Sequence, residues 1–317
     1  MFDITRFKRE FKVYTELRRH TNYMNNIRII KGNVMANSMS SKGGISARSF
    51  NGGYWGMASS PLFTDDETID VIHKAGENAL LLKSKGDKNY TKEFFQRPIV
   101  INKNFRTLKP KFSQKQRVDF CMALDDYIAK KYSDLMSRNV QYFGINMEKN
   151  LLTSEGTESY TFTPKSQIFI SMTADRQGSP VNLMRILPVG GLGEFEDFYC
   201  DPENLYGYID AQYEDLMKKK EGVFPEGGMK DCILAPDLAG ILAHEAVGHT
   251  VEADIVLSGS IAYNLLGEKV ASDLVTMVDF ANTAFGETCQ VPVYVDDEGT
   301  EAMDQIKKEI NPLLCAQ

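Results

Sequence analysis

Pro236 to Asp254 reads PDLAGILAHEAVGHTVEAD and holds two of the four histidines in the 317-residue chain. His244, Glu245 and His249 form the pattern H-E-x-x-x-H. Two neutral imidazoles beside a carboxylate suit zinc-dependent hydrolysis, because imidazoles bind zinc, the ion acidifies a water molecule and the glutamate takes its proton. The sequence therefore predicts His244 and His249 as zinc ligands and Glu245 as the general base.

The spacing of the two histidines predicts an unusual helix. Five residues of a regular α-helix turn through about 500°, which leaves the two side chains roughly 140° apart. One π-type turn of about 4.4 residues would bring them within roughly 50°, and such turns are frequent at functional sites. We expect the helix to deform between His244 and His249, with Gly248 as the position where the backbone yields. The alternative is a chance pattern on an amphipathic helix, with both histidines satisfied by the core or by solvent.

The residues on either side of the motif extend this prediction. DCILAP at 231–236 is apolar and predicts a buried strand that leads into the helix, with Asp237 as its candidate N-cap. Glu252 and Asp254 follow near the expected helix end, where the helix dipole disfavours negative charge. We expect one of them, Glu252 first, to accept a hydrogen bond from a ligand imidazole. The alternative is a pair of solvated acids.

ILAHEAVGHTVEAD at 241–254 closely resembles the signature of the TldD/PmbA family, whose TldD-type members are metallopeptidases once called modulators of DNA gyrase. Further resemblances lie in SARSFNGGYWGMASS at 46–60, LLTSEGTES at 151–159 and VPVYVDDEGTEAM at 291–303. The resemblance covers about residues 43 to 303. It implies a zinc metallopeptidase that hydrolyses unfolded peptides and works as a homo-oligomer or with a PmbA-type subunit.

The same resemblance implies that part of the catalytic domain is missing. Family members continue past the DDEGT run at 296–300, and their C-terminal part supplies a cysteine as third zinc ligand. Cys315 does not lie in a matching motif. Zinc held by two protein ligands is expected to bind weakly, since catalytic sites use three ligands and a water. Three alternatives stay open: the metal-bearing part of a peptidase, a catalytically silent subunit, and a binding module with structural histidines.

Composition excludes several classes of protein. Hydrophobic residues at 43% and charged residues at 25% describe an ordinary globular protein. The net charge of −7 argues against a nucleic-acid surface. The N-terminus has no apolar signal core, and no apolar run approaches the roughly 18 residues of a membrane span. Five scattered cysteines are typical of reduced thiols. We therefore expect a cytoplasmic protein without nucleic-acid or membrane partners.

Periodicity predicts an α+β fold with three domains. We expect residues 1–111 to form an N-terminal hairpin-and-helix domain and 112–222 a central β-rich domain, and the resemblance implies that 223–317 is the start of an incomplete metallopeptidase domain. Asn51-Gly52 and Gln177-Gly178 predict hairpin turns, and Thr64 and Ser113 predict helix starts. Strands are expected between residues 139 and 188, and helices over 6–20 and after Pro202.

Overall fold

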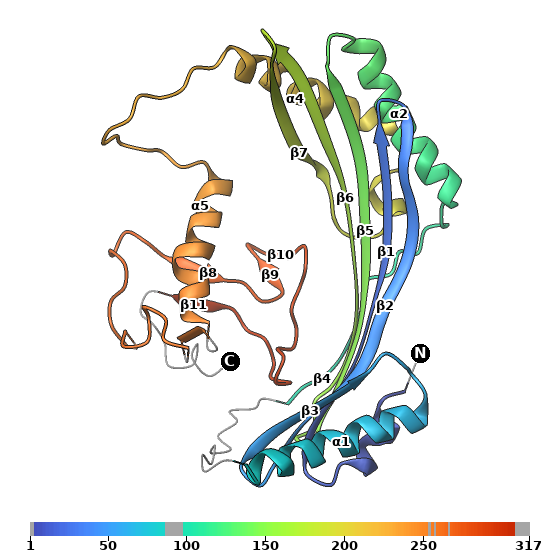
Figure 1. Ribbon diagram of the computed structural model, residues 1–317, viewed down its shortest axis with the longest axis vertical. Helices are drawn as coiled ribbons and strands as arrows, with labels where there is room; N and C mark the ends of the chain where they lie inside the picture. Colours follow the sequence, from blue (N-terminus) through green and yellow to red (C-terminus); the bar gives the residue numbers. More distant parts are fainter. Residues whose placement is uncertain (1–2, 86–97, 253–254, 257, 266, 308–317) are drawn as a thin grey trace. The chain divides into compact units, whose positions relative to one another are not determined.

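The computed structural model describes residues 3–85, 98–252, 255–256, 258–265 and 267–307 (Figure 1). They belong to two compact units, one made of residues 1–91 and 100–224 and the other of 92–99 and 225–317. The fold is α+β and is built on one large, mostly antiparallel sheet, which confirms the predicted class. The three-domain division at 111/112 and 222/223 stays a prediction.

A seven-stranded sheet organises the first unit. Its strands follow the order β3-β2-β1-β5-β6-β4, and β7 also pairs with β6. Neighbouring strands are antiparallel except for β4 and β6. The strands are β1 (Tyr14–Ile30), β2 (Asn33–Asn51), β3 (Tyr54–Ser60), β4 (Val100–Asn104), β5 (Ser137–Thr153), β6 (Glu158–Arg176) and β7 (Ser179–Leu192).

Two tight turns in this sheet join the strands that the sequence predicts to form hairpins. Gly52 and Gly53 join β2 to β3 with φ angles of 61° and 91°. Gln177 and Gly178 join β6 to β7 with φ angles of 51° and 85°. These positive angles suit the two-residue turns that match the twist of paired strands, and they favour glycine. Both predicted hairpins are confirmed, but the first turn, Gly52-Gly53, lies one residue later than the predicted Asn51-Gly52, because Asn51 pairs with Tyr54 as the last residue of β2.

Two helices of the first unit, α1 and α2, begin at the predicted residues. The Thr64 side chain accepts a hydrogen bond from the backbone N–H of Glu67, and Ser113 and Gln116 form a reciprocal capping box. Each cap satisfies a backbone N–H that the first helical turn leaves unpaired. The helical segments are η1 (Thr5–Glu10), α1 (Asp65–Lys83), α2 (Gln114–Lys131), α3 (Phe195–Phe198), η2 (Pro202–Leu205) and α4 (Tyr206–Glu221).

Two separate hydrophobic cores lie on one face of this sheet. Leu17 of β1 and Leu152 of β5 pack with α1, whereas Ile27 of β1 packs with α2 and α4. Leu17 and Ile27 are an even number of residues apart on one strand, so their side chains share a face. The cross-strand pairs of side chains that lie between the two cores are polar. Helices α1 and α2 lie at opposite ends of the sheet (Figure 1).

The predicted N-terminal helix over residues 6–20 is wrong. A short 3₁₀ turn, η1, ends at Glu10, and β1 begins at Tyr14. The side chain of Glu16 in β1 accepts hydrogen bonds from Arg48 Nε and Nη2 in β2, at 2.8 and 3.1 Å. This pair joins two neighbouring strands, while Leu17 is fully buried under α1. Tertiary contacts therefore override the helix propensity of this charged segment.

The second unit carries the motif helix and short strands. Its elements are α5 (Pro236–Ala243), η3 (His244–Gly248), η4 (His249–Val251), β8 (Met277–Asp279), β9 (Thr283–Ala284), β10 (Glu287–Thr288) and β11 (Gln305–Lys307). Strand β8 pairs with β11, and β9 pairs with β10. Among the described helices of the chain, none combines the length and apolar character needed to cross a membrane.

Candidate metal centre

The motif helix begins slightly earlier than predicted. Ala235 is the N-cap, with an extended backbone, and Pro236 is the first helical residue. Proline is favoured there because its fixed φ suits a helix and its missing N–H would be unpaired anyway. Asp237 therefore lies in the first turn, and its predicted role as N-cap is wrong. Residues 231–235 form no strand, so the predicted apolar strand before the helix is also wrong.

The helix changes its pitch at the first histidine. Helix α5 ends at Ala243, the five residues His244–Gly248 form a π turn, and a 3₁₀ turn follows from His249. The backbone N–H of His249 donates to the carbonyl of His244, five residues earlier. The two imidazole ring centroids lie 4.3 Å apart. The predicted deformation, with both rings on one side, is confirmed.

Gly248 does not need its conformational freedom here. Its φ of −51° is one that any residue adopts. A Cβ added at this position would lie 3.7 Å from the Ala243 carbonyl oxygen and 3.9 Å from His244 Nδ1, which are ordinary contacts. The π turn therefore forms without the conformational freedom of glycine, on which the prediction for Gly248 relied.

The turn brings together three side chains of the kinds that can hold a metal ion. One ligand atom from each of His244, Glu245 and His249 lies within 4.8 Å of the others. Zinc binds imidazole nitrogen at about 2.0–2.1 Å, so two ligands of one ion are separated by up to about 4.2 Å. The observed spread exceeds that limit by up to about 0.6 Å, so the side chains would have to move slightly closer to hold one ion. Two imidazoles and a carboxylate are donors that zinc accepts, and the set fits the predicted ion.

Glu252 makes the contact expected of it. Its Oε1 lies 2.6 Å from His249 Nδ1. With the proton on Nδ1, the ring donates to the carboxylate and Nε2 keeps its lone pair for a metal ion. His249 Nε2 also lies 3.9 Å from Glu245 Oε2, on the side of the cluster. Asp254 and Cys315, the other residues considered for this site, lie outside the described residues.

Replacing Glu252 with glutamine is expected to weaken zinc binding about tenfold, because partners of ligand imidazoles contribute 10- to 100-fold to metal affinity. The substitution removes the charge that favours the Nδ1–H form of His249. A zinc titration against a chromophoric chelator measures the change. Glu268→Gln, at an exposed acid outside the cluster, is the control. Equal affinities for the two variants would show that Glu252 has no such role.

Family models match both ends of the described chain. Residues 15–80 match the PmbA/TldA metallopeptidase domain 1, which here comprises β1, β2, β3 and most of α1. Residues 227–306 match the PmbA/TldA metallopeptidase C-terminal domain, which contains the H-E-x-x-x-H cluster. The segment with the deformed helix is therefore the one that matches the metallopeptidase C-terminal domain model.

Curated relatives are named as metalloproteases. A metalloprotease of Methanocaldococcus jannaschii is 27% identical over 295 residues, which is 91% of this chain and 62% of the relative. A zinc metalloprotease TldD homolog of Saccharolobus solfataricus is 25% identical over 258 residues, or 79% of this chain and 52% of the relative. The chain thus spans little more than half the length of these relatives.

Solved structures share the fold at low sequence identity. A protein of Thermotoga maritima named as a modulator of DNA gyrase has a TM-score of 0.70 at 16% identity, covering 98% of this chain and 70% of that one. TldE of Thermococcus kodakarensis has a TM-score of 0.63 at 13% identity, covering 96% and 67%. The two domain models, the named relatives and this common fold agree, and the chain belongs to the TldD/PmbA family.

Proposed function

We propose that this chain is the metal-bearing part of a TldD-type zinc metallopeptidase that hydrolyses unfolded peptides in the cytoplasm. The observation that carries the proposal is the π turn, which brings the imidazoles of His244 and His249 to one side of the helix beside Glu245. A regular helix would hold the two rings apart. The helix is thus deformed at the residues whose side chains a metal site needs.

Each side chain of the cluster has a separate role in this proposal. His244 and His249 hold the zinc ion through ring nitrogens, and Glu252 orients the His249 ring through Nδ1. When bound, zinc supplies Lewis acidity at the scissile carbonyl and at the attacking water. Glu245 accepts the proton of that water at a carboxylate oxygen and returns it to the leaving amine. His244 and Glu245 are exposed, so a peptide can reach them.

We also propose that the chain works in an oligomer, as a homo-oligomer or with a PmbA-type subunit. Helix α5 has no buried residue, and Leu238, Ile241 and Leu242 of this helix are each more than half exposed. Exposed apolar clusters on folded proteins commonly mark interfaces. The likeness to a solved TldE fold gives the family context for such a partner.

A catalytically silent subunit is the second candidate function. If Glu245 acts as the base, the described cluster offers only two imidazoles as ligands, whereas catalytic zinc sites use three protein ligands. On this alternative the chain acts as a peptide-binding subunit. Adding the polypeptide that corresponds to the rest of the relatives' length separates the two functions, because peptidase activity should appear only if the first is correct.

Zinc binding to alanine variants tests the proposed site directly. We expect His244→Ala and His249→Ala each to lower zinc affinity by more than tenfold, since each removes one of the imidazole ligands. His73→Ala is the matched control, because His73 belongs to α1 in the other unit. Isothermal titration with zinc measures all four proteins. Unchanged zinc affinity in both motif variants would refute the metal site.

A further inference from the structure

Four tyrosines form two face-to-face pairs between helices α2 and α4. Tyr127 of α2 stacks on Tyr206 of α4 with ring centroids 3.7 Å apart and an angle of 4° between the ring planes. Tyr132, the C-cap of α2, stacks on Tyr213 of α4 at 3.8 Å and 14°. Aromatic pairs usually keep their centroids about 4.5–7 Å apart, in offset or edge-to-face arrangements. Both pairs are therefore held closer than aromatic attraction alone favours.

Both phenols of the second pair donate to carboxylates. The Tyr132 hydroxyl lies 2.5 Å from Asp210 Oδ1, and the Tyr213 hydroxyl lies 3.0 Å from each carboxylate oxygen of Asp134. Lys131 Nζ donates to Asp210 Oδ2 at 2.8 Å. Desolvation opposes the ionised form of Asp210, but the hydrogen bonds from Lys131 and Tyr132 outweigh it and lower the pKa of this carboxyl. Asp210 is therefore ionised at neutral pH and can accept a proton.

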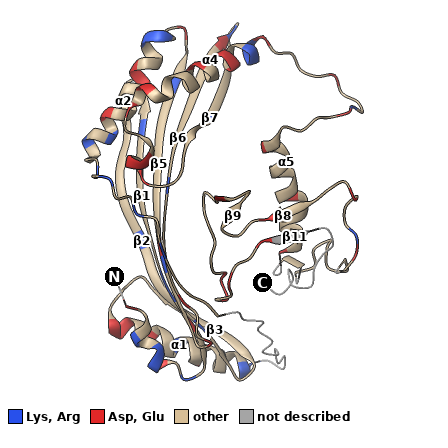
Figure 2. Cartoon of the chain, turned by 180° about the vertical axis from the view of Figure 1, so that it is seen from behind, with Lys and Arg blue, Asp and Glu red and all other residues tan. Residues whose placement is uncertain are grey.

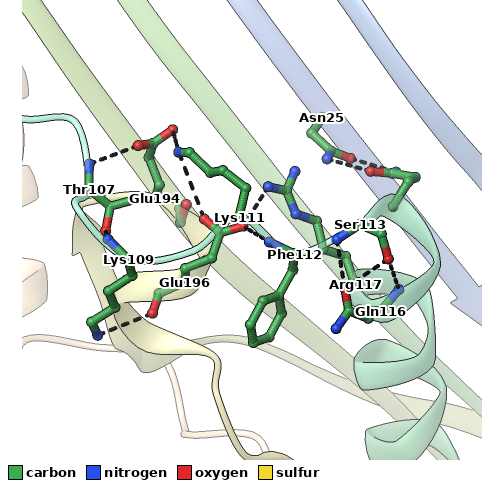
Figure 3. Close-up of polar contacts among 12 residues, drawn as sticks. Asn25, Thr107, Lys109, Lys111, Phe112, Ser113, Gln116, Arg117, Glu194 and Glu196 are labelled. Carbon is green, nitrogen blue, oxygen red and sulfur yellow. Dashed lines mark hydrogen bonds and ion pairs between the residues drawn. The ribbon is translucent and has the colours of Figure 1, made fainter.

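Contacts outside the tyrosines fix the two helices against each other. Acidic and basic residues occur along both α2 and α4 (Figure 2). Glu196, in α3 just ahead of α4, accepts hydrogen bonds from the Phe112 N–H and from Arg117 Nη2 of α2, at 2.8 and 2.7 Å (Figure 3). In α4, Gln212 Nε2 donates to backbone carbonyls of β6 and β7. Neither helix can slide along the other without breaking these bonds, so the tyrosine rings are held in place.

Stacked phenols beside carboxylates suit one-electron oxidation. A phenol that loses an electron also loses its hydroxyl proton, which here can pass along the existing hydrogen bonds from Tyr132 to Asp210 and from Tyr213 to Asp134. The unpaired electron of the resulting phenoxyl radical resides partly on the ring carbons next to the carbon that bears the oxygen. Rings stacked at 3.8 Å are in van der Waals contact, for which the optimum is about 3.5–4.0 Å. Two radicals formed in this pair can therefore join without a large movement.

We propose that Tyr132 and Tyr213 form an oxidative modification site, at which a diffusible one-electron oxidant, such as a peroxide-derived radical, joins the two rings as dityrosine. Two oxidant equivalents each take one electron, and the two phenolic protons pass to Asp210 and Asp134 and then to water. A carbon–carbon bond forms between the ring positions next to the oxygens. Each of these carbons then loses its hydrogen as a proton while each oxygen regains one, which restores both phenols. The product has two hydrogen atoms fewer and links α2 to α4 covalently.

Oxidation of the whole chain, read out residue by residue, gives the first test. The oxidant is a light-activated ruthenium bipyridyl complex with persulfate, and mass spectrometry of a protease digest measures dityrosine in each peptide. We expect the link between Tyr132 and Tyr213 in at least tenfold excess over any product of Tyr208, which is 45% exposed but stacks on no described ring. An equal yield at Tyr208, or no link between Tyr132 and Tyr213, would overturn the proposal. An equal mixture of isotope-labelled and unlabelled chains should give no mixed product, and a mixed product would overturn it by placing the link between two copies.

The other stacked pair is an internal comparison. Tyr127 donates to Asp210 Oδ1 at 2.7 Å, but none of the described residues accepts a hydrogen bond from Tyr206. Because only one of its phenols has a carboxylate beside it, this pair should give at least threefold less dityrosine than Tyr132 and Tyr213, although its rings lie slightly closer. Equal yields from the two pairs in the same sample would show that stacking alone directs the reaction and would overturn the proposal.

Two matched variants test the carboxylates directly. Asp134→Asn should lower the yield of the link between Tyr132 and Tyr213 at least threefold, because an amide is a far weaker proton acceptor than a carboxylate. Asp119→Asn is the control, since Asp119 is an exposed acid of α2 that pairs with Lys115. Both substitutions are at exposed positions, so the fold should be retained. Equal yields from the two variants would overturn the assignment of Asp134 as proton acceptor.

Discussion

Replacing Glu245 with glutamine is expected to lower the peptidase activity of the zinc-loaded, complete assembly by about 10²- to 10⁴-fold, the usual contribution of a general base. The amide cannot take a proton from the attacking water. His244 and His249 remain in place, so the bound zinc should be unchanged. Cleavage of a quenched fluorescent peptide and metal analysis of the same sample measure the two quantities separately.

Comparing activity and bound zinc in the same variants distinguishes a general base from a zinc ligand. Glu268→Gln should retain full activity and zinc, because it lies outside the cluster. If Glu245→Gln loses zinc as well, Glu245 is a ligand and the base must be sought elsewhere. The 317-residue chain alone should show little activity with added zinc, since two imidazoles hold the ion weakly. Rapid cleavage by this chain with bound zinc would contradict the two-ligand site.

Gly56→Ala is expected to destabilise the first unit by about 3 kcal/mol, at the upper end for overpacked sites. A Cβ at Gly56 of β3 would lie 2.2 Å from the carbonyl oxygen of Ala75 and 2.3 Å from the amide nitrogen of Ala79. Both atoms belong to the backbone of α1, so no side-chain rotation relieves the clash. Urea unfolding followed by circular dichroism measures the change in the free energy of unfolding.

Gly76→Ala on the same helix is the control for this substitution. The nearest atom to its new Cβ would be Val13 Cγ2 at 3.8 Å, an ordinary contact. Alanine inside a helix should stabilise the unit by about 0.5–1 kcal/mol, because glycine loses more conformational entropy on folding. If both variants destabilised the unit equally, the close packing of β3 against α1 would not be the cause.

Local chemistry explains which parts of the fold could be predicted from the sequence. The caps at Thr64 and Ser113 satisfy nearby backbone groups, and Gly178 adopts a turn that few other residues allow, so neighbouring residues alone determine these features. The π turn could be predicted because a metal ion shared by His244 and His249 would require both rings on one side of the helix. The contact of Glu252 with His249 could also be predicted locally, because the two residues are only three positions apart.

The failed predictions concern segments whose structure depends on distant residues. Tyr14–His20 is charged enough to suit a helix, yet it lies in β1 between β2 and β5, which the sequence does not show to be its neighbours. The apolar residues Ile233 and Leu234 suggested a strand, but no described strand pairs with them. A third ligand of the proposed zinc site could likewise not be predicted from local spacing, because such a ligand need not lie near the motif.

The shared strands of the two cores set the order in which this protein can fold as it is synthesised. Leu152 of β5 completes the core under α1, although the other buried members of that core lie within residues 4–75. Strand β1 also needs β5 along its second edge. The hairpin of β1 and β2 and helix α1 therefore leave the ribosome long before β5 is synthesised. Until then, the edge of β1 that pairs with β5 stays unpaired. Closing such a long loop is slow, and an unpaired strand edge tends to aggregate in the meantime. We therefore expect chaperones to bind these segments during synthesis.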